Sequence, residues 1–554
     1  MHTMRIVILA LGVAGILAGG CRGPGPRADV NGGPQLFEGL GTYHRAVTTS
    51  SPQAQRYFDQ GLVLAMAFNH DEAIRSFEEA ARLDPGCAAA WWGVALCHGP
   101  HINNPEMSEA QSRAAWAALQ KALTLSAQAS PTEQALIQAL AARYAESPPA
   151  DRRPLDEAYA RAMRDVWLAH RKDSDVGTLY AEAMMNLRPW DLWTLDGRPQ
   201  PGTEEIVAVL EEVLRMVPDH PGACHLYIHA VEASPHPERA LAAADRLRDR
   251  VPGAGHLVHM PSHIYARTGR WAAASTVNEK AIAADRRYQA ASPRQEFYRV
   301  YMAHNHHFLA FSSMMEGRRA AGLRAAREMI AGIPPEYIQA NPALVDPYLC
   351  IKLDVLKRFG RWDEILREPA PPEYLPITTA MWHFSRGIAC AVKKQFDSAE
   401  REQAAFRAAV ARVPADAMFQ VNRAHDVLAI ADHVLVGEIA FMRGQTDAAV
   451  AALEAGVEIE DRLRYMEPPE WIQPVRHTLG AVLLEAGRHG DAERVYREDL
   501  RRWPENGWSL HGLARCLRAR GANDQAAAVE RRFRDAWARA DVSIGASCAC
   551  AERR

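Results

Sequence analysis

Hydrophobic and polar positions follow the period of amphipathic helices along this chain, and a two-helix pattern recurs. Residues 54–86 combine an apolar helix, a short turn, the segment DEAI, a second helix and a proline. The apolar positions recur every third or fourth residue, without the alternation that marks a strand. A second copy begins about 34 residues later, at residue 88, which is the spacing of a helix–turn–helix repeat.

Further copies extend this pattern over most of the chain. Each helix pair leaves an apolar stripe that only a neighbouring pair can bury, so such pairs stack into a solenoid with a concave face. The sequence therefore predicts an all-α fold, a superhelical solenoid of about ten helix–turn–helix units. An unrelated helical bundle is the alternative, but it does not require the recurring register. Units or degenerate units start at residues 175, 221, 255, 303, 346, 380, 430, 473 and 507.

Several segments resemble those of a known family. They are FNHDEAIRSFEEAARLDP, AAWWGVAL followed by GPHINNP, VPGAGHLVHMPSHIY and EPPEWIQPVRH. In these segments the chain resembles poorly characterised bacterial tetratricopeptide repeat (TPR) proteins, including lipoprotein-like members. The resemblance covers nearly the whole mature chain and implies the TPR fold. It implies no established activity, and whether the protein is an enzyme stays open.

The N-terminus has the pattern of a targeting segment. Residues 6–17 form an apolar run that is too short for a stable membrane span, and AGGC follows at residues 18–21. We interpret Cys21 as the lipidated first residue of an exported, periplasmic or cell-envelope protein, whose only membrane contact is its lipid anchor. An ordinary cleaved secretory signal is the alternative.

The same patterns suggest a division of the chain into segments. The expected boundaries are 1–21 for the signal peptide, 22–38 for a flexible tether, 39–218 for an N-terminal TPR segment with insertions, 219–335 for a histidine-rich TPR segment, 336–540 for a C-terminal TPR segment and 541–554 for a tail.

The charge and the motifs of the chain argue against two classes of function. The 554 residues carry 64 Lys and Arg against 67 Asp and Glu, a net charge of −3. Nucleic-acid binding is not expected, because it requires a basic surface. Phosphate-loop and dinucleotide motifs are missing from the sequence, so we expect no nucleotide cofactor. Cys548 and Cys550 form a C-x-C pair in the tail. Such a pair suggests a disulfide or a pair of metal ligands.

Histidines concentrate in one stretch. Ten of the 22 lie between His220 and His307. When the units are aligned, His225 and His229 take positions 5 and 9 of one unit, and His259 and His263 take the same positions of the next. His256 and Glu232 fall at positions 2 and 12. These four positions span about 80° of one helix face, and the TPR resemblance implies that this face lines the concave groove.

Other residues are expected to extend this patch. Seven other histidines are expected to be ordinary core or surface residues: His44, His70, His170, His236, His425, His433 and His489. A lid or ligand wall is one interpretation of the loops that carry His98, His101 and Trp190, and packing is the other. The candidates for the groove wall are Glu182, His304, His307, His98, His101 and Trp190.

Two imidazoles four residues apart on a helix can hold one metal ion. We therefore predict a transition-metal site in the groove, with copper, zinc or iron as the ion. Imidazoles that hold an anionic or aromatic ligand, or a purely structural cluster, are the alternatives. Pro261 lies between His259 and His263 and can break the helix there, which would take His259 off the shared face. The competing function is a metal-free interaction scaffold that holds a peptide, a protein or a small molecule in the groove.

Overall fold

The computed structural model describes residues 34–292 and 294–551, and these residues form two compact units. Unit 1 comprises residues up to Pro261 and Lys280–Met302. Unit 2 comprises Ser262–Glu279 and the chain from Ala303 onward. None of the described helices is both long and apolar enough to cross a membrane. The lipidation site expected at Cys21 lies outside the described residues.

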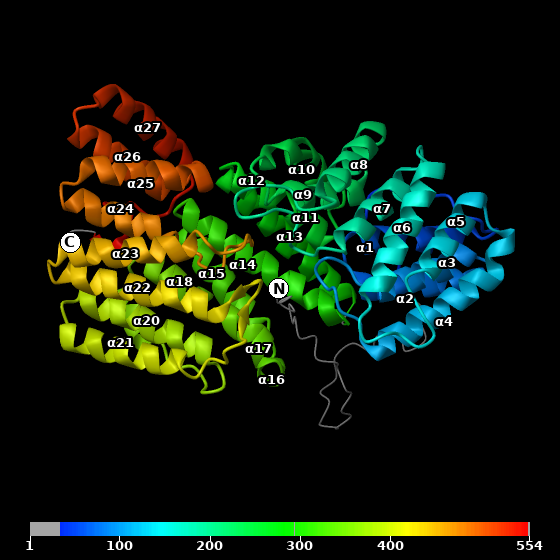
Figure 1. Ribbon diagram of the computed structural model, residues 1–554, viewed down its shortest axis with the longest axis horizontal. Coiled ribbons are helices and arrows are strands. Elements are labelled where there is room, and N and C mark those ends of the chain that lie inside the picture. The colour runs from blue at the N-terminus through cyan, green and yellow to red at the C-terminus, as the bar shows by residue number, and fades with distance from the viewer. Residues whose placement is uncertain (1–33, 293, 552–554) are drawn as a thin grey trace. The chain divides into compact units, whose positions relative to one another are not determined.

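Unit 1 is built from helices that pack as antiparallel neighbours along the chain (Figure 1). Three short 3₁₀ turns, η1 (Ser126–Gln128), η2 (Pro237–Ala240) and η3 (Glu296–Tyr298), connect some of them. The helices are α1 (Pro52–Met66), α2 (His70–Leu83), α3 (Ala88–His98), α4 (Glu109–Leu125), α5 (Pro131–Ala141), α6 (Arg153–Ala169), α7 (Ser174–Met185), α8 (Thr203–Met216), α9 (Pro221–Val231), α10 (Leu241–Leu247) and α11 (Gly255–His259).

Unit 2 contains a regular stack of hairpins from α20 to α27, coloured yellow-green to red in Figure 1. Its elements are α15 (Arg319–Ala331), α16 (Pro335–Ala340), α17 (Pro342–Val345), η4 (Asp346–Tyr348), α18 (Ile351–Arg358), α19 (Trp362–Arg367), α20 (Pro376–Val392), α21 (Phe396–Val410), β1 (Met418–Phe419), β2 (Asn422–Arg423), α22 (Ala424–Met442), α23 (Thr446–Glu460), α24 (Val475–Glu485), α25 (His489–Arg502), α26 (Gly507–Ala519), α27 (Asn523–Ala536) and η5 (Ala549–Ala551). Helices α12 (Pro261–Arg267), α13 (Trp271–Ala291) and α14 (Arg299–Met315) include the positions where the chain passes from one unit to the other.

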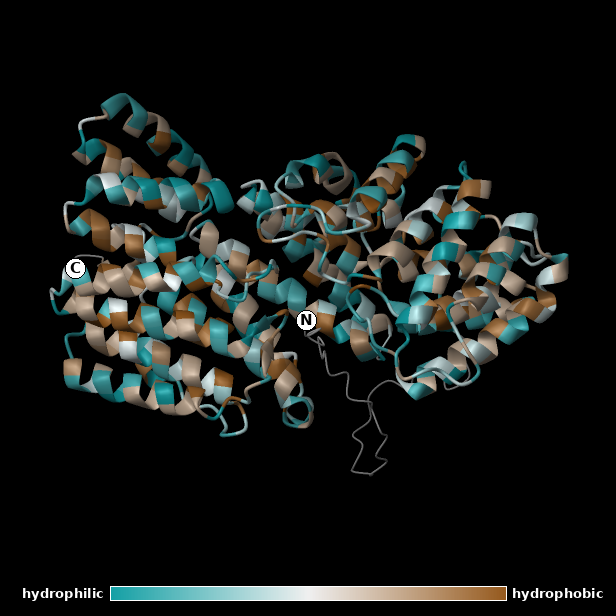
Figure 2. Ribbon diagram, in the orientation of Figure 1, coloured by the Kyte–Doolittle hydropathy of each residue, from teal (hydrophilic) through white to brown (hydrophobic). Residues whose placement is uncertain are grey.

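A ring set between two glycines joins successive hairpins. Phe77 on α2 is fully buried between Gly61 on α1 and Gly93 on α3, and a Cβ atom at either glycine would lie 2.7 Å from the ring. Tyr496 on α25 packs in the same way between the glycines at positions 480 and 512. Apolar and polar residues lie side by side on many of the helices, as Figure 2 shows, because one face of such a helix enters the core and the other meets water.

The turn between the two helices of a hairpin has its own constraint. In six of the described hairpins one turn residue has a positive φ, between 61° and 77°, and this residue is a glycine because side chains disfavour that conformation. Such glycines occur at positions 269, 317, 360, 444, 487 and 521. The exceptions in this position are Phe68, with φ 55°, and Lys394, with φ 60°.

These helix pairs confirm the prediction of an all-α, TPR-type solenoid fold. The hairpins expected from residues 54, 380, 430, 473 and 507 are present as α1–α2, α20–α21, α22–α23, α24–α25 and α26–α27. In the unit that starts at residue 255, the expected first helix is divided into two short helices. There α11 ends at His259 and α12 starts at Pro261, since proline cannot continue the hydrogen-bond ladder of the preceding turn.

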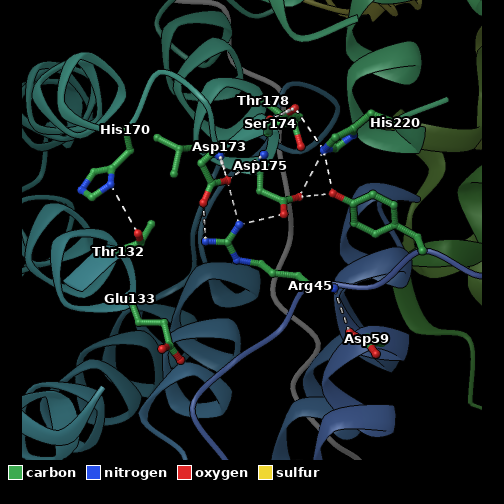
Figure 3. Close-up of polar contacts among 12 residues, drawn as sticks. Arg45, Asp59, Thr132, Glu133, His170, Asp173, Ser174, Asp175, Thr178 and His220 are labelled. Atoms are coloured by element: carbon green, nitrogen blue, oxygen red, sulfur yellow. Dashed lines mark hydrogen bonds and ion pairs between the residues drawn. The ribbon is translucent and has the colours of Figure 1, made fainter. Parts of the chain in front are cut away.

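A partly buried polar network connects the extended segment before α1 to the helices of unit 1 (Figure 3). Arg45 Nη1 donates to Asp173 and to Asp175, each at 2.8 Å. The Tyr43 hydroxyl donates to Asp175 Oδ1 at 2.7 Å, and His220 Nε2 lies 3.1 Å from the same oxygen. Asp173 caps the N-terminus of α7 and His220 caps that of α9, so the network also fixes where both helices begin.

The chemistry of Asp175 depends on these partners. Burial acts to raise the pKa of Asp175, but the hydrogen bond from His220, the positive charge of Arg45 and the hydrogen bond from Tyr43 outweigh it. They hold the pKa of this carboxyl well below its usual range. Because the folded-state pKa is depressed, the contribution of Asp175 to stability is fully present above the unfolded pKa of about 3.9 and is lost as the pH falls below it.

Replacement of Gly93 should show the importance of the ring contact. Gly93→Ala places a Cβ atom against Phe77 and should lower the free energy of unfolding by about 1–3 kcal/mol. Gly490→Ala is the matched control, because no atom lies within 4 Å of its added Cβ and alanine favours a helix. Urea denaturation measures both. Equal effects of the two variants would contradict the packing argument.

Replacement of Asp175 should destabilise unit 1 in a pH-dependent manner. Asp175→Ala leaves the Arg45 guanidinium without one buried carboxylate and should cost about 3–5 kcal/mol at pH 7. The difference from the unaltered protein should shrink as the pH falls from about 4 to 3. Hydrogen exchange of peptides from α7 and α9, measured at both pH values, reports the change locally. A difference that does not depend on pH would show that the carboxylate charge is not involved.

Candidate metal centre

Three imidazoles of unit 1 converge, and we call His225, His229 and His256 the histidine cluster. His225 and His229 lie one turn apart on α9, with ring centroids 4.9 Å apart. His256 lies on α11, with its ring 4.9 Å from that of His225. One nitrogen of each ring lies within 4.8 Å of the others, and the three residues are buried. This spacing is short enough for all three to bind one metal ion.

Hydrogen bonds fix the orientation of two of these rings. His225 Nδ1 lies 2.7 Å from the Met66 carbonyl oxygen, which can only accept, so this nitrogen carries the proton. His229 Nδ1 lies 2.7 Å from a carboxylate oxygen of Glu232, at the C-terminal end of α9. In the neutral rings the Nε2 atoms therefore carry the lone pairs. Metal-binding histidines are usually held in this way, by a carbonyl or carboxylate at the other ring nitrogen.

Two aromatic residues in strained backbone conformations cover the cluster. The Phe68 ring lies 4.5 Å from that of His225 and 5.6 Å from that of His256. The Trp190 ring lies 5.4 Å from that of His229. Phe68 and Trp190 have φ values of 55° and 57°, and bulky side chains rarely adopt such values without a functional or packing reason.

The position of Phe68 explains its strain. It lies in the α1–α2 turn at the place where six other hairpins have glycine. Its backbone therefore has the steric strain of a left-handed conformation, which a glycine would avoid. Trp190 is positioned by the insertion after α7, in which Trp193 Nε1 donates to the Ala230 carbonyl at the end of α9. Sequence reasoning did not identify Phe68 as part of the site. The signal for it was a phenylalanine in a turn where the repeat favours glycine.

Further polar and aromatic groups surround the cluster. His101 stacks on Phe68 at 4.3 Å, and its ring lies 4.5 Å from that of His70. Burial, followed by the charges of nearby histidines, lowers the pKa of His101 well below its usual value, and burial lowers the pKa of His70 to about 4. Both rings are therefore neutral at pH 7. Tyr301 packs against His256 with 4.4 Å between the ring centroids.

The helix is interrupted between α11 and α12, but the histidines that were expected to form a second pair stay close: a ring nitrogen of His259 and one of His263 lie within 4.8 Å of each other. His259 belongs to unit 1, where its ring lies 5.9 Å from that of His256. His263 belongs to unit 2, where its Nδ1 lies 3.0 Å from a carboxylate oxygen of Glu467 and its ring lies 6.0 Å from that of His304. The two residues thus lie on different helical segments.

The other candidates lie in varied surroundings. Burial raises the pKa of Glu182, whereas the nearby Arg143 charge acts to lower it. His98 is the last residue of α3. His307 is buried in unit 2 against Tyr348, and burial lowers its pKa to about 4. The metal-ligand group that includes His225 and His256 does not contain any of these three residues.

Comparison with known proteins gives no named family for the chain. No family model and no curated protein matches it. Among solved structures, it is similar to a human IFIT1 dimer with m7Gppp-AAAA at 13% identity and a TM-score of 0.31, covering 88% of this chain and 91% of that one. The APC/C hetero-tetramer Cut9-Hcn1 is 15% identical, with a TM-score of 0.30 over 84% of this chain and 76% of that one. Yeast Tom70 is 10% identical, with a TM-score of 0.29 over 87% of this chain and 91% of that one. Similarities this distant carry no functional argument.

The covering role of Phe68 is open to a direct comparison with Lys394. Phe68→Gly relieves the turn but removes a buried ring, so it should lower the free energy of unfolding by about 2–4 kcal/mol. Lys394→Gly relieves the same strain at an exposed position and should raise stability by about 1 kcal/mol. Thermal and urea unfolding measure both variants. A stabilised Phe68→Gly variant would contradict a role for the ring.

Proposed function

We propose that the protein binds a transition-metal ion at His225, His229 and His256. The observation that carries the proposal is the convergence of three buried imidazole nitrogens within 4.8 Å. The hydrogen bonds to Met66 and Glu232 support it, because they direct the two Nε2 lone pairs of α9 away from the protonated ring edges.

The ligand type narrows the choice of metal. Neutral imidazoles suit Zn²⁺, Cu²⁺ and Fe²⁺, and at equal availability copper binds most tightly. Three nitrogen ligands leave at least one coordination position for a further ligand. Glu232 contributes a negative charge beside His229, and this charge offsets part of the charge of a divalent ion. Phe68 and Trp190 limit access to water on their side of the site.

Export and anchoring belong to the same proposal. The support is the N-terminal sequence alone: an apolar run followed by small residues and Cys21. A lipid-anchored protein in the cell envelope would hold its metal outside the cytoplasm. Metal handling and metal-dependent chemistry are both compatible with the site, and the open coordination position favours a ligand that binds to the metal.

A second candidate function is a metal-free interaction scaffold. The observation that favours it is a cavity of about 710 Å³ at the last hairpins of unit 2. His511, Arg515 and Glu530 are among the residues that line it, and their mixed charge suits a polar peptide. Under this alternative the histidine cluster would be structural, and a peptide would bind equally well with and without metal.

Titration of the metal-stripped full chain distinguishes the two functions. Under oxidising conditions we expect about one Zn²⁺ to bind per chain by calorimetry, and Cu²⁺ to give a paramagnetic resonance spectrum with nitrogen coupling. His229→Ala or His256→Ala should weaken the binding at least about 100-fold, and Glu232→Gln about 10–100-fold, the usual effect of removing a group that orients a ligand.

A matched control is His170→Ala, which removes a histidine of the same unit at the end of α6. It should leave the affinity for Zn²⁺ unchanged. Circular dichroism of every variant checks that the helices are intact. A folded, unaltered chain that binds neither Zn²⁺ nor Cu²⁺ would exclude the metal centre and leave the scaffold as the better function.

A further inference from the structure

The C-terminal tail of unit 2, residues 545–551, docks against the helices of that unit. Arg515 Nη1 donates to the Gly545 carbonyl at 2.8 Å, and the Ser547 hydroxyl donates to the His477 carbonyl at 2.8 Å. The Tyr496 and Ser547 hydroxyls lie 2.6 Å apart. Ser547 is 1% exposed and Cys550 is 4% exposed. The tail is therefore packed into unit 2 as part of its structure.

The docked tail brings two sulfur atoms to a buried carboxylate. Cys548 and Cys550 form a disulfide. Their sulfur atoms and a carboxylate oxygen of Glu438, on α22, all lie within 4.8 Å of one another. Glu438 is 2% exposed, and its Oε2 atom has no hydrogen-bond partner among the described residues. Burial raises the pKa of Glu438 to about 7, and the ionised form of this buried carboxyl requires a hydrogen-bond donor or a cation.

The space beside this group is small and charged. Cys548, Glu438, Lys357 and Arg358 line a cavity of about 10 Å³, which has room for one small ion or one water molecule. Two thiolates and a carboxylate would bring three negative charges to it, and Lys357 and Arg358 bring two positive charges. The negative charges would then outnumber the positive charges by one, so the net charge favours a bound cation once both thiolates have formed.

We propose that Cys548, Cys550 and Glu438 form a second, redox-gated site in unit 2 for one thiophilic divalent ion. In the disulfide form the two sulfurs are bonded to each other and cannot both act as thiolate ligands. A dithiol reductant transfers two electrons and two protons to this disulfide and becomes a disulfide itself. The ion then displaces both thiol protons and binds two thiolates and the carboxylate.

The geometry of the tail is compatible with this chelate. The Cα atoms of Cys548 and Cys550 lie 5.2 Å apart, and metal–thiolate bonds of about 2.3 Å in a tetrahedral arrangement place two sulfurs about 3.8 Å apart. The side chains can therefore bind one ion without a change in the course of the backbone. Because both sulfurs are buried, the reductant reaches them when the tail detaches from Tyr496 and His477.

Cadmium titration of the full chain tests this site apart from the histidine cluster. The background carries His229→Ala and His256→Ala, and the chain is reduced with dithiothreitol that is then removed without oxygen. We expect about one Cd²⁺ per reduced chain, with thiolate-to-cadmium charge-transfer absorption in the ultraviolet, and no such absorption in the oxidised chain. Cys548→Ala or Cys550→Ala should abolish this absorption.

Two further variants show whether cadmium binding depends on this group of residues specifically. Glu438→Gln keeps both cysteines and should weaken cadmium binding at least about tenfold while the absorption at saturation remains. Cys390→Ala removes a buried free thiol of the same unit and should change neither value. Absorption that persists in the Cys548→Ala and Cys550→Ala variants, or its absence from the reduced chain with both cysteines, would overturn the proposal.

Discussion

The contact on which the fold depends is a buried ring held between glycines of two neighbouring helices. Phe77 lies between Gly61 and Gly93, and Tyr496 lies in the same relation to two glycines of the last hairpins. Because the glycines have no side chains, the helices approach closely and each hairpin acquires one fixed position against the next. Close packing of one hairpin against the next allows residues from different hairpins to meet at one place.

The histidine cluster is accompanied by strain in the backbone of the residues that cover it. Its candidate ligand nitrogens come from α9 and α11, whereas the rings that cover it come from the α1–α2 turn and from the insertion after α7. Phe68 and Trp190 both adopt a left-handed conformation there. Such conformations persist only where the surroundings compensate for them. The compensation for Phe68 is its packing on His101, His225 and His256, so the strain and the cluster depend on each other.

The sequence predicted the hairpins because their signal is repeated and local. Apolar periodicity and the two-helix pattern recur along the chain, so an error in the interpretation of one unit is corrected by the others. The place of His225, His229 and His256 on one face also followed from register. The orientation of the rings did not, because it depends on Met66 and Glu232, and contacts with a distant carbonyl leave no trace in the spacing of histidines.

Pro261 shows why register alone is an incomplete guide. The alignment gives His259 and His263 the same positions as the pair on α9, yet the helix ends at His259 and a new one begins at Pro261. A proline ring excludes one hydrogen bond of the helix. Met260, between the two segments, nevertheless keeps helical dihedrals, and His259 and His263 still offer nitrogens within 4.8 Å of each other. The pair on α9 has no such interruption. The same pattern of residues thus brings two imidazoles together on one continuous helix in one unit and across a proline interruption in the next.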